Sequence, residues 1–278
     1  MPIRQRTITR AVSLSGVGVH SGAAVRVRLL GAPPGAGVIF SRCDLGPGAL
    51  RATLENVRST RRGVTLGDGV TVASVEHLLA AAAGLCIDNL QVEVEGPELP
   101  ALDGSAAGYV EALAGAGIVE QEEPARVIEL GEVEVTVGDA RAVTRAGGEL
   151  RVRYIVDLPP PLGRQVATAD LSVFATAIAP ARTWGFVDEA ATLRAAGLAR
   201  GAGPGNVLVI AAGGYLNPPR FADEPVRHKI LDLLGDLALL GARLHGYVEV
   251  VRGGHALHVA LAREIARRWG ERNARTEP

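Results

Sequence analysis

The segment His-Lys-Ile-Leu-Asp at positions 228–232 combines side chains that bind divalent cations. His228 and Asp232 are four residues apart, so on a helix both project from one face and could bind one ion. A third ligand is needed, and the best candidate is His77, which directly follows the carboxylate of Glu76 at the start of another expected helix. Two histidines and one aspartate would complete the protein ligands of a catalytic zinc site, leaving a fourth position for water.

Lys229 follows the first of these residues and is the only lysine among the 29 lysine and arginine residues. Where a positive charge alone is sufficient, this sequence uses arginine, whereas a compact ammonium group makes different contacts from a planar guanidinium. The alternative is that one lysine has persisted by chance in an arginine-rich sequence. The neighbouring candidate ligands favour a functional role.

A single histidine near the start of a helix more often has ordinary capping partners, and this alternative applies to His77 and His228 taken separately. Their combination with Asp232, Lys229 and Glu76 favours a metal site. Glu76 would then be the natural general base for the metal-bound water. If His77 were not a ligand, the same carboxylate would be explained by a favourable interaction with the helix dipole.

The composition is that of a globular protein, with 278 residues, 47% hydrophobic content and a net charge of −1. This charge and the dispersed arginines provide no basic surface for nucleic acid. The N-terminus lacks an apolar signal core, and no apolar run reaches the ~18–20 residues of a membrane span. We therefore expect a cytoplasmic protein that is not stably inserted in a membrane. We also expect it to be a monomer.

The pattern of strands and helices predicts an α+β fold. Alternating segments near residues 7–14, 24–30 and 38–42, and a hairpin with its turn at Gly67-Asp68-Gly69, predict antiparallel strands. One helix is expected from an N-cap at Ser74 to a left-handed cap at Gly84. Further helices are expected over about 105–116, 225–240 and 255–269.

The charged segment 120–124, which ends in proline, is the best candidate for a linker. It divides the chain into residues 1–121, with Glu76 and His77, and residues 125–278, with His228, Asp232 and His255. In both halves a helix carries a histidine, a glycine follows seven residues later, and a Val-Glu-Val strand comes next. This shared order suggests a duplicated unit whose helices pack face to face, so that the candidate ligands meet.

Seven short motifs resemble those of the UDP-3-O-acyl-N-acetylglucosamine deacetylase family, the zinc amidases of lipid A biosynthesis. Each motif alone is weak, but seven in the same order, from about Arg4 to Ala260, form a specific set. The motifs are Gly-Val-Gly-Val-His-Ser-Gly at 16–22, Ser-Val-Glu-His-Leu-Leu-Ala at 74–80, Ile-Asp-Asn at 87–89, Leu-Asp-Gly-Ser-Ala at 102–106, Arg-Thr-Trp-Gly-Phe at 182–186, Val-Arg-His-Lys through Gly-Asp-Leu at 226–237, and Gly-Gly-His-Ala-Leu at 253–257.

The resemblance implies two α+β domains in a sandwich with the active site at their junction. It implies zinc-dependent hydrolysis of the N-acetyl group of UDP-3-O-(3-hydroxyacyl)-N-acetylglucosamine, with Glu76 as general base and release of acetate. His255, which follows two glycines, would be the general acid or the cationic stabiliser of the oxyanion. Asp236, eight residues after His228 and on about the same helix face, would orient and charge His255.

The resemblance also identifies residues that would contact the substrate. Thr183 matches the threonine that hydrogen-bonds the acyl oxygen, and Lys229 would contact the sugar or its phosphates. Residues 185–212 match the insert that forms the passage for the acyl chain. His245 and His258 match no motif and are expected at the surface. Further substrate-binding candidates are Trp184, which replaces the usual phenylalanine, Phe186 and His20.

Two other functions remain compatible with the motifs. A non-catalytic protein could be stabilised by the same two histidines and one aspartate, but it would have no need for Glu76, Lys229 and His255 nearby. A zinc hydrolase could also act on another amide, such as a peptide or a different acetylated sugar, recognised by the insert.

Overall fold

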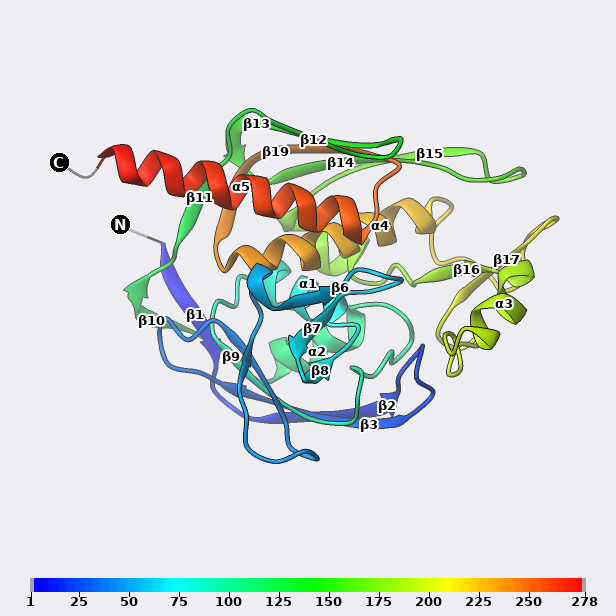
Figure 1. The fold of residues 1–278 in the computed structure, drawn as a ribbon, viewed down its shortest axis with the longest axis horizontal. Coiled ribbons are helices and arrows are strands. Elements are labelled where there is room, and N and C mark those ends of the chain that lie inside the picture. Colours follow the sequence, from blue (N-terminus) through cyan, green and yellow to red (C-terminus); the bar gives the residue numbers. More distant parts are fainter. Residues whose placement is uncertain (1–2, 277–278) are drawn as a thin grey trace.

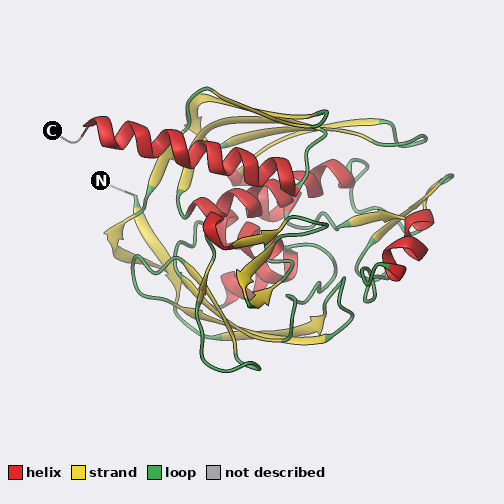
Figure 2. Cartoon of the chain, viewed as in Figure 1, coloured by secondary structure: helices red, strands yellow, loops and turns green. Residues whose placement is uncertain are grey.

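A computed structural model describes residues 3–276 as two main β-sheets with helices layered between them (Figure 1, Figure 2). The first sheet has the strand order β2 (Val12–Val17), β3 (Ala24–Gly31), β9 (Leu90–Glu95), β4 (Val38–Arg42), β5 (Leu50–Arg51). The second has the order β12 (Val133–Val137), β13 (Ala140–Glu149), β19 (Arg243–Val251), β14 (Arg151–Asp157), β15 (Arg164–Asp170), with β11 (Val127–Glu129) also paired to β19.

Alternating burial along the strands explains why each sheet has one face against the helices. In β3, Val25, Val27 and Leu29 are buried while the intervening residues are exposed. Over its whole length β19 alternates between half-buried and buried residues. Side chains of successive strand residues point to opposite faces, so this alternation places one apolar face of each sheet toward the centre of the molecule.

The layer between the sheets contains α1 (Glu76–Gly84), α2 (Ala107–Gly115), α4 (Glu224–Leu237) and α5 (His255–Thr276). Helices α1 and α4 pack against each other at the centre, α2 contacts α1 and β2, and α5 packs on α4 and β12 (Figure 1). No helix among residues 3–276 is both long and apolar enough to span a bilayer.

The two main sheets share one topology. Numbering the five principal strands of each sheet in chain order, both have the spatial order first, second, fifth, third, fourth. In both, the fifth strand pairs antiparallel with the second and parallel with the third. A central helix precedes the fifth strand and another helix follows it, so α1 corresponds to α4 in position and α2 to α5.

Three small sheets complete the fold. Strands β6 (Val57–Ser59), β7 (Thr65–Asp68) and β8 (Val70–Val72) include the expected hairpin. Its turn, at residues 68–70, is one residue later than expected, because Gly67 still pairs with Thr71. Strands β16 (Trp184–Phe186), β17 (Leu208–Ala211) and β18 (Gly214–Tyr215) form, with α3 (Ala190–Ala195), the projection at the right of Figure 1. The third pairs β1 (Arg4–Ile8) with β10 (Ile118–Pro124).

The linker expected at residues 120–124 is wrong, because this segment belongs to strand β10. Its acidic side chains are tolerated since they are exposed on a two-stranded ribbon, where charges do not disturb a core. Gln121 is less exposed, and its side-chain amide donates to the carbonyl of Ala32. A charged sequence ending in proline is therefore a strand here.

Both expected caps of α1 are also wrong. Ser74 has a positive φ of 56°, and its hydroxyl donates to Glu98 instead of capping the helix. Gly84 is the last helical residue, and the left-handed residue is Cys86 with a φ of 54°. Gly84 is needed for space, because a Cβ atom there would overlap the ring of Phe174.

We predict that Gly235→Ala destabilises the fold, since a Cβ atom on Gly235 of α4 would overlap the backbone of Glu76 in α1. Overpacking of this kind typically costs about 1–3 kcal/mol. Gly270→Ala in α5 is the control, because a Cβ atom there meets open space and alanine favours helix by roughly 1 kcal/mol. Urea denaturation should order the stabilities as Gly270→Ala, wild type, Gly235→Ala. Equal stability of wild type and Gly235→Ala would contradict the close crossing.

Candidate metal centre and active site

The crossing of α1 and α4 brings His77, His228 and Asp232 together. The Asp232 Oδ1 atom lies 3.2 Å from His228 Nε2 and 3.9 Å from His77 Nε2. The two imidazole rings are 5.0 Å apart and nearly perpendicular. One potential ligand atom from each residue lies within 4.8 Å of the others, a spacing at which three side chains can bind one ion.

The charges of this cluster suit a cation. Burial, together with the neighbouring His228, lowers the pKa of His77 to about 3, so its imidazole is neutral. Burial alone would raise the pKa of Asp232, but His228 and Lys229 hold it well below its usual value. A metal ion requires deprotonated ligands, and these groups offer a neutral imidazole and a carboxylate without prior loss of protons.

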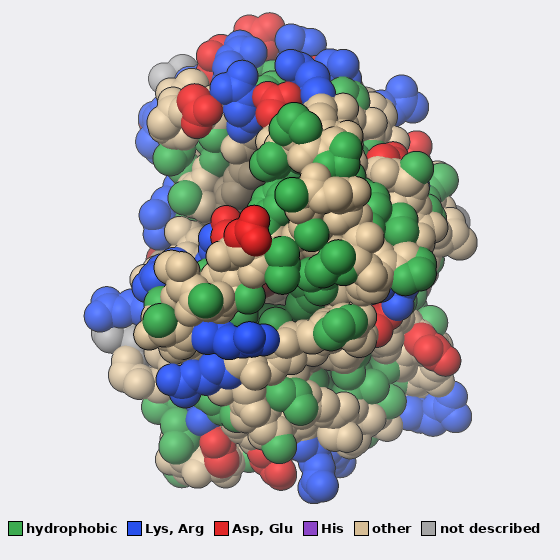
Figure 3. Space-filling model, turned by 90° about the vertical axis from the view of Figure 1, so that its right-hand side faces the viewer, with side chains coloured by type: hydrophobic (Ala, Val, Ile, Leu, Met, Phe, Trp, Pro, Cys, Tyr) green, Lys and Arg blue, Asp and Glu red, His purple; other side chains and the backbone are tan. Residues whose placement is uncertain are grey.

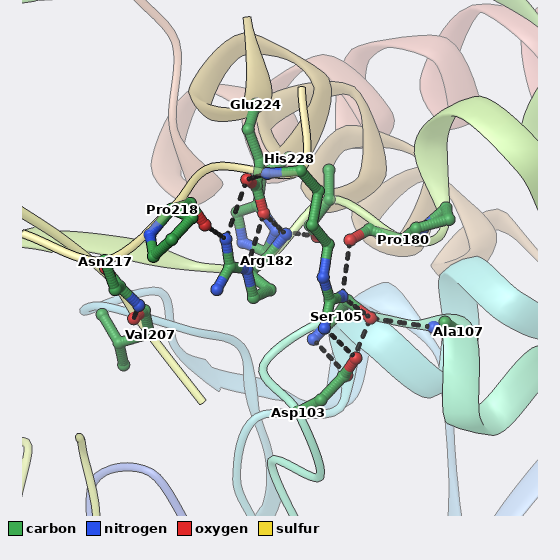
Figure 4. Close-up of polar contacts among 12 residues, drawn as sticks. Asp103, Ser105, Ala107, Pro180, Arg182, Val207, Asn217, Pro218, Glu224 and His228 are labelled. Atoms are coloured by element: carbon green, nitrogen blue, oxygen red, sulfur yellow. Dashed lines mark hydrogen bonds and ion pairs between the residues drawn. The ribbon is translucent and has the colours of Figure 1, made fainter. Parts of the chain in front are cut away.

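Neighbouring hydrogen bonds orient two of the candidate ligands. His228 Nδ1 donates to the carbonyl of Ala181 at 3.0 Å, which fixes the tautomer and leaves Nε2 free to bind an ion (Figure 4). Lys229 Nζ donates to Asp232 Oδ2 at 2.9 Å, so Oδ1 remains available beside the two imidazoles. This donor set of two nitrogens and one oxygen fits Zn²⁺.

Glu76 lies beside this cluster with its carboxylate buried. Its Oε2 atom accepts a hydrogen bond from the backbone N–H of Val64 at 2.9 Å, and its Oε1 atom is 4.0 Å from His255 Nε2. Burial raises the pKa of Glu76 to about 7, and the nearby Asp236 and Asp232 add to this effect while His255 opposes it. A carboxyl group with this pKa can accept and release a proton near neutral pH.

His255 is at the first position of α5, where its Nδ1 donates to Asp236 Oδ2 at 2.7 Å. Burial disfavours its charged form, but Asp236 and then Asp232 outweigh this and raise the pKa of His255 to about 10. The imidazole is therefore a cation at neutral pH, with its Nε2 directed toward Glu76. The expected pairing of Asp236 with His255 is present in the structure.

The expectation that His258 lies at the surface is wrong, because His258 is fully buried. Its Nδ1 donates to the same Asp236 Oδ2 atom at 2.8 Å, and Tyr154 lies 2.9 Å from its Nε2. His255 and His258 are three residues apart on α5 and so face α4 together. This i,i+3 spacing was the feature of the sequence that could have placed His258 beside His255. His255, His258 and Asp236 also have metal-binding spacing, but both Nδ1 atoms already donate to the carboxylate.

The remaining candidates line a cavity of about 740 Å³ that reaches the metal cluster. Thr183 is held by its backbone N–H, which donates to Gly104 at 2.7 Å. The Trp184 ring lies beneath Lys229, with the ammonium 5.8 Å from its centre. Figure 3 shows hydrophobic side chains gathered on the face that carries β16–β18. Apolar lining residues from residues 185–216 are Phe186, Val187, Ala190, Leu193, Ala199, Ala202, Pro204, Val207, Val209 and Leu216.

His20 also lines this cavity and bonds to both halves of the chain. Its Nε2 donates to the carbonyl of Arg62 at 2.8 Å, and its Nδ1 accepts from the backbone N–H of Ala199 at 3.4 Å. His245, also expected at the surface, is not among the residues that line this cavity. It lies in β19, its side chain is 29% exposed, and it pairs with Glu129.

We predict that the protein binds one Zn²⁺ ion per chain at His77, His228 and Asp232. Replacement of both histidines by alanine should abolish stoichiometric binding, since one carboxylate alone is a weak zinc site. His245→Ala is the matched control and should retain the ion. Elemental analysis after dialysis measures the outcome, and an unchanged zinc content in the double variant would contradict the assignment.

Comparison with known proteins gives one consistent result. Residues 5–267 match the family model described as LpxC, UDP-3-O-acyl N-acetylglycosamine deacetylase. The UDP-3-O-acyl-N-acetylglucosamine deacetylase of Thermosynechococcus vestitus is 45% identical over 267 residues, which cover 94% of both chains. The protein of that name from Myxococcus xanthus is 43% identical over 270 residues, covering 94% of this chain and 86% of the relative. The chain therefore belongs to the UDP-3-O-acyl-N-acetylglucosamine deacetylase family.

Proposed function

We propose that this protein hydrolyses the N-acetyl group of UDP-3-O-acyl-N-acetylglucosamine, a step of lipid A biosynthesis, and releases acetate. The name of its relatives supports the substrate. The observation that carries the chemistry is the juxtaposition of Glu76 and His255, 4.0 Å apart, beside the cluster of His77, His228 and Asp232. A carboxyl base and a cationic imidazole at a metal site are the groups that amide hydrolysis requires.

Zinc is the metal that we propose for this site, since two oriented imidazoles and a carboxylate fit it better than an all-oxygen cation. When bound, it would polarise the amide carbonyl and lower the pKa of the attacking water. Lys229 would keep Asp232 ionised and correctly rotated for this ion, because it already binds the second carboxylate oxygen.

We propose that Glu76 is the general base that takes a proton from the attacking water. Its raised pKa makes it a stronger base than an exposed carboxylate. The hydrogen bond from the Val64 backbone N–H fixes Oε2 and leaves Oε1 free to accept the proton. His255 would stabilise the negative oxygen of the tetrahedral intermediate or protonate the leaving amine. Asp236 keeps this imidazole charged and oriented.

The cavity suits the rest of the substrate. Its apolar part, lined by the β16–β18 projection, would accept the acyl chain, and the polar part beside Lys229 and His20 would accept the nucleotide sugar. Thr183 lines the same cavity as the metal cluster and would hydrogen-bond the acyl oxygen. Trp184 and Phe186 would contact the substrate from the same strand, with their rings in edge contact at 5.7 Å.

We also propose that the two halves of the chain, residues 1–121 and 125–278, arose by duplication and form two domains with the site between them. The shared strand order of the two main sheets supports this origin, as does the equivalent position of α1 and α4 before the fifth strand. Each half contributes part of the site, with Glu76 and His77 from the first and the other candidates mainly from the second.

Replacing Glu76 by alanine should lower turnover by about 10²–10⁴-fold, the usual contribution of a general base, while the zinc content stays at one per chain. Acetate release from UDP-3-O-acyl-N-acetylglucosamine measures the loss. The unacylated sugar nucleotide, assayed in parallel with the wild type, tests whether the acyl chain is recognised. Near wild-type turnover of the variant would assign the base to another group. Zinc binding without acetate release by the wild type would favour a structural metal site or another amide as substrate.

The pH dependence should depend on His255. Its folded-state pKa of about 10 lies above its ordinary value, so the charged form is lost only as pH rises toward that value, and a bound cation would lower it. We therefore predict a basic limb in kcat/KM that moves to lower pH in Asp236→Asn, because the main favourable charge is removed. A pH profile of both proteins measures this shift. An unchanged basic limb would mean that another group is the acid.

Lys229→Arg should be nearly as damaging as Lys229→Ala. Lys229 is confined between Asp232 and the Trp184 ring, and a planar guanidinium is wider than the ammonium that fits there. We expect a loss chiefly in KM, with smaller change in kcat, since Lys229 would bind substrate and not transfer protons. Steady-state kinetics of the two variants test this expectation. Wild-type constants for Lys229→Arg would show that the position needs only positive charge.

A further inference from the structure

A buried ion pair lies one helical turn before the candidate metal ligand His228. Glu224, in the first turn of α4, is fully buried, and Arg182 is 7% exposed. Four donors meet the Glu224 carboxylate. They are Arg182 N at 2.9 Å, Arg182 Nε at 2.8 Å, Arg182 Nη2 at 3.1 Å and the backbone N–H of Arg220 at 2.6 Å. All the lone pairs of this carboxylate are thus engaged inside the protein.

The peptide group between Ala181 and Arg182 connects this carboxylate to His228. Its N–H donates to Glu224 Oε1, and its C=O accepts from His228 Nδ1 at 3.0 Å. Figure 4 shows these bonds converging between the start of α4 and the segment that contains Arg182. Glu224 and His228 are four residues apart on one helix face, so a single peptide group spans both side chains.

The same segment is anchored to the first half of the chain. Its neighbours bond across the junction, with Ala106 N donating to Ala179 O at 2.9 Å and Thr183 N donating to Gly104 O at 2.7 Å. Arg220 adds an ion pair with Asp103 at 2.8 Å and a bond to the carbonyl of Pro180. The Ala181 carbonyl that accepts from His228 is therefore positioned both by α4 and by the first half of the chain.

We propose that Glu224, acting with Arg182, is a positioning residue for the metal centre that sets the tautomer, rotation and basicity of His228. The Glu224 carboxylate accepts a hydrogen bond from the N–H of the Ala181–Arg182 peptide group. This bond orients the C=O of the same peptide group toward His228 Nδ1. A hydrogen bond to the N–H also polarises the peptide, which strengthens its C=O as an acceptor and makes Nε2 a better ligand. Arg182 neutralises the buried negative charge of Glu224, so this pair adds no net charge beside the metal cluster.

This proposal rests on the metal site proposed above, and its direct readout is metal affinity. Zn²⁺ dissociation constants would be measured on the purified full-length metal-free protein by competition with a chelating dye. The visible spectrum of the Co²⁺-loaded protein would report ligand geometry. The variants are Glu224→Ala, Glu224→Gln, and the double variant Glu224→Leu with Arg182→Met, which removes both charges. Glu249→Gln is the control, since Glu249 forms an ion pair of the same length, 2.8 Å, with Arg153 between β14 and β19. That pair is partly exposed, so the control tests the loss of an arginine–carboxylate pair as such.

We expect Glu224→Ala and the double variant to bind Zn²⁺ about 10–100-fold more weakly, the usual effect of removing an outer partner of a ligating histidine, with an altered Co²⁺ spectrum. The Zn²⁺ affinity of Glu224→Gln should lie between those of these variants and the wild type, because its amide oxygen can still accept from Arg182. Glu249→Gln should match the wild type. If Glu224→Ala does not fold, the double variant decides, because it leaves no buried unpaired charge.

Wild-type affinity and spectrum in the folded variant would overturn the proposal while leaving the metal site in place. A lower melting temperature with unchanged Zn²⁺ affinity and Co²⁺ spectrum would indicate a role in stability alone and would also overturn the proposal. His228→Ala is measured in the same assay. If His228→Ala binds zinc as the wild type does, the metal assignment itself fails, and the positioning role fails with it.

Discussion

The close crossing of α1 and α4 is the constraint on which the rest of the site depends. Gly235 allows it, because any side chain there would overlap the Glu76 backbone. At this crossing the first helix contributes a carboxylate and an imidazole, and the second contributes His228 and Asp232. The two sheets bury the outer faces of the helical layer, so the packing of the core also fixes the distances between the functional groups.

The site also requires that its buried carboxylates be balanced by nearby positive charges. Three carboxylates, Glu76, Asp232 and Asp236, are buried within one region, and each isolated charge there would be costly. Lys229 compensates Asp232, and His255 compensates Asp236. The nearest cation to Glu76, His255, is 4.0 Å away, compared with 2.9 Å and 2.7 Å for the other two pairs, and burial raises the pKa of Glu76 to about 7. The carboxyl group with the most distant cation is the one suited to exchange a proton near neutral pH.

Residue spacing and motif order predicted much of this arrangement. The i,i+4 spacing predicted that His228 and Asp232 share a helix face, and the Glu-His dipeptide suggested His77 as the third ligand. The pairing of Asp236 with His255 was predicted from the family resemblance, and the mixed α+β class followed from alternation. Features fixed by tertiary contacts were not predictable. Gly84 is explained only by the ring of Phe174, and the charged strand β10 only by its pairing with β1. His258 was missed because its i,i+3 spacing from His255 predicts a shared helix face but does not show what packs against that face. Glu224 was missed because its partner is 42 residues away.

We propose that the α1–α4 crossing builds a zinc site from His77, His228 and Asp232 beside Glu76 and His255. The most direct measurement is a crystal structure of the zinc-loaded protein, with anomalous diffraction recorded on both sides of the zinc absorption edge. The account predicts one strong anomalous peak within about 2.0–2.2 Å of both Nε2 atoms and an Asp232 oxygen. A peak bound instead by Asp236, His255 and His258, or none at the crossing, would contradict it.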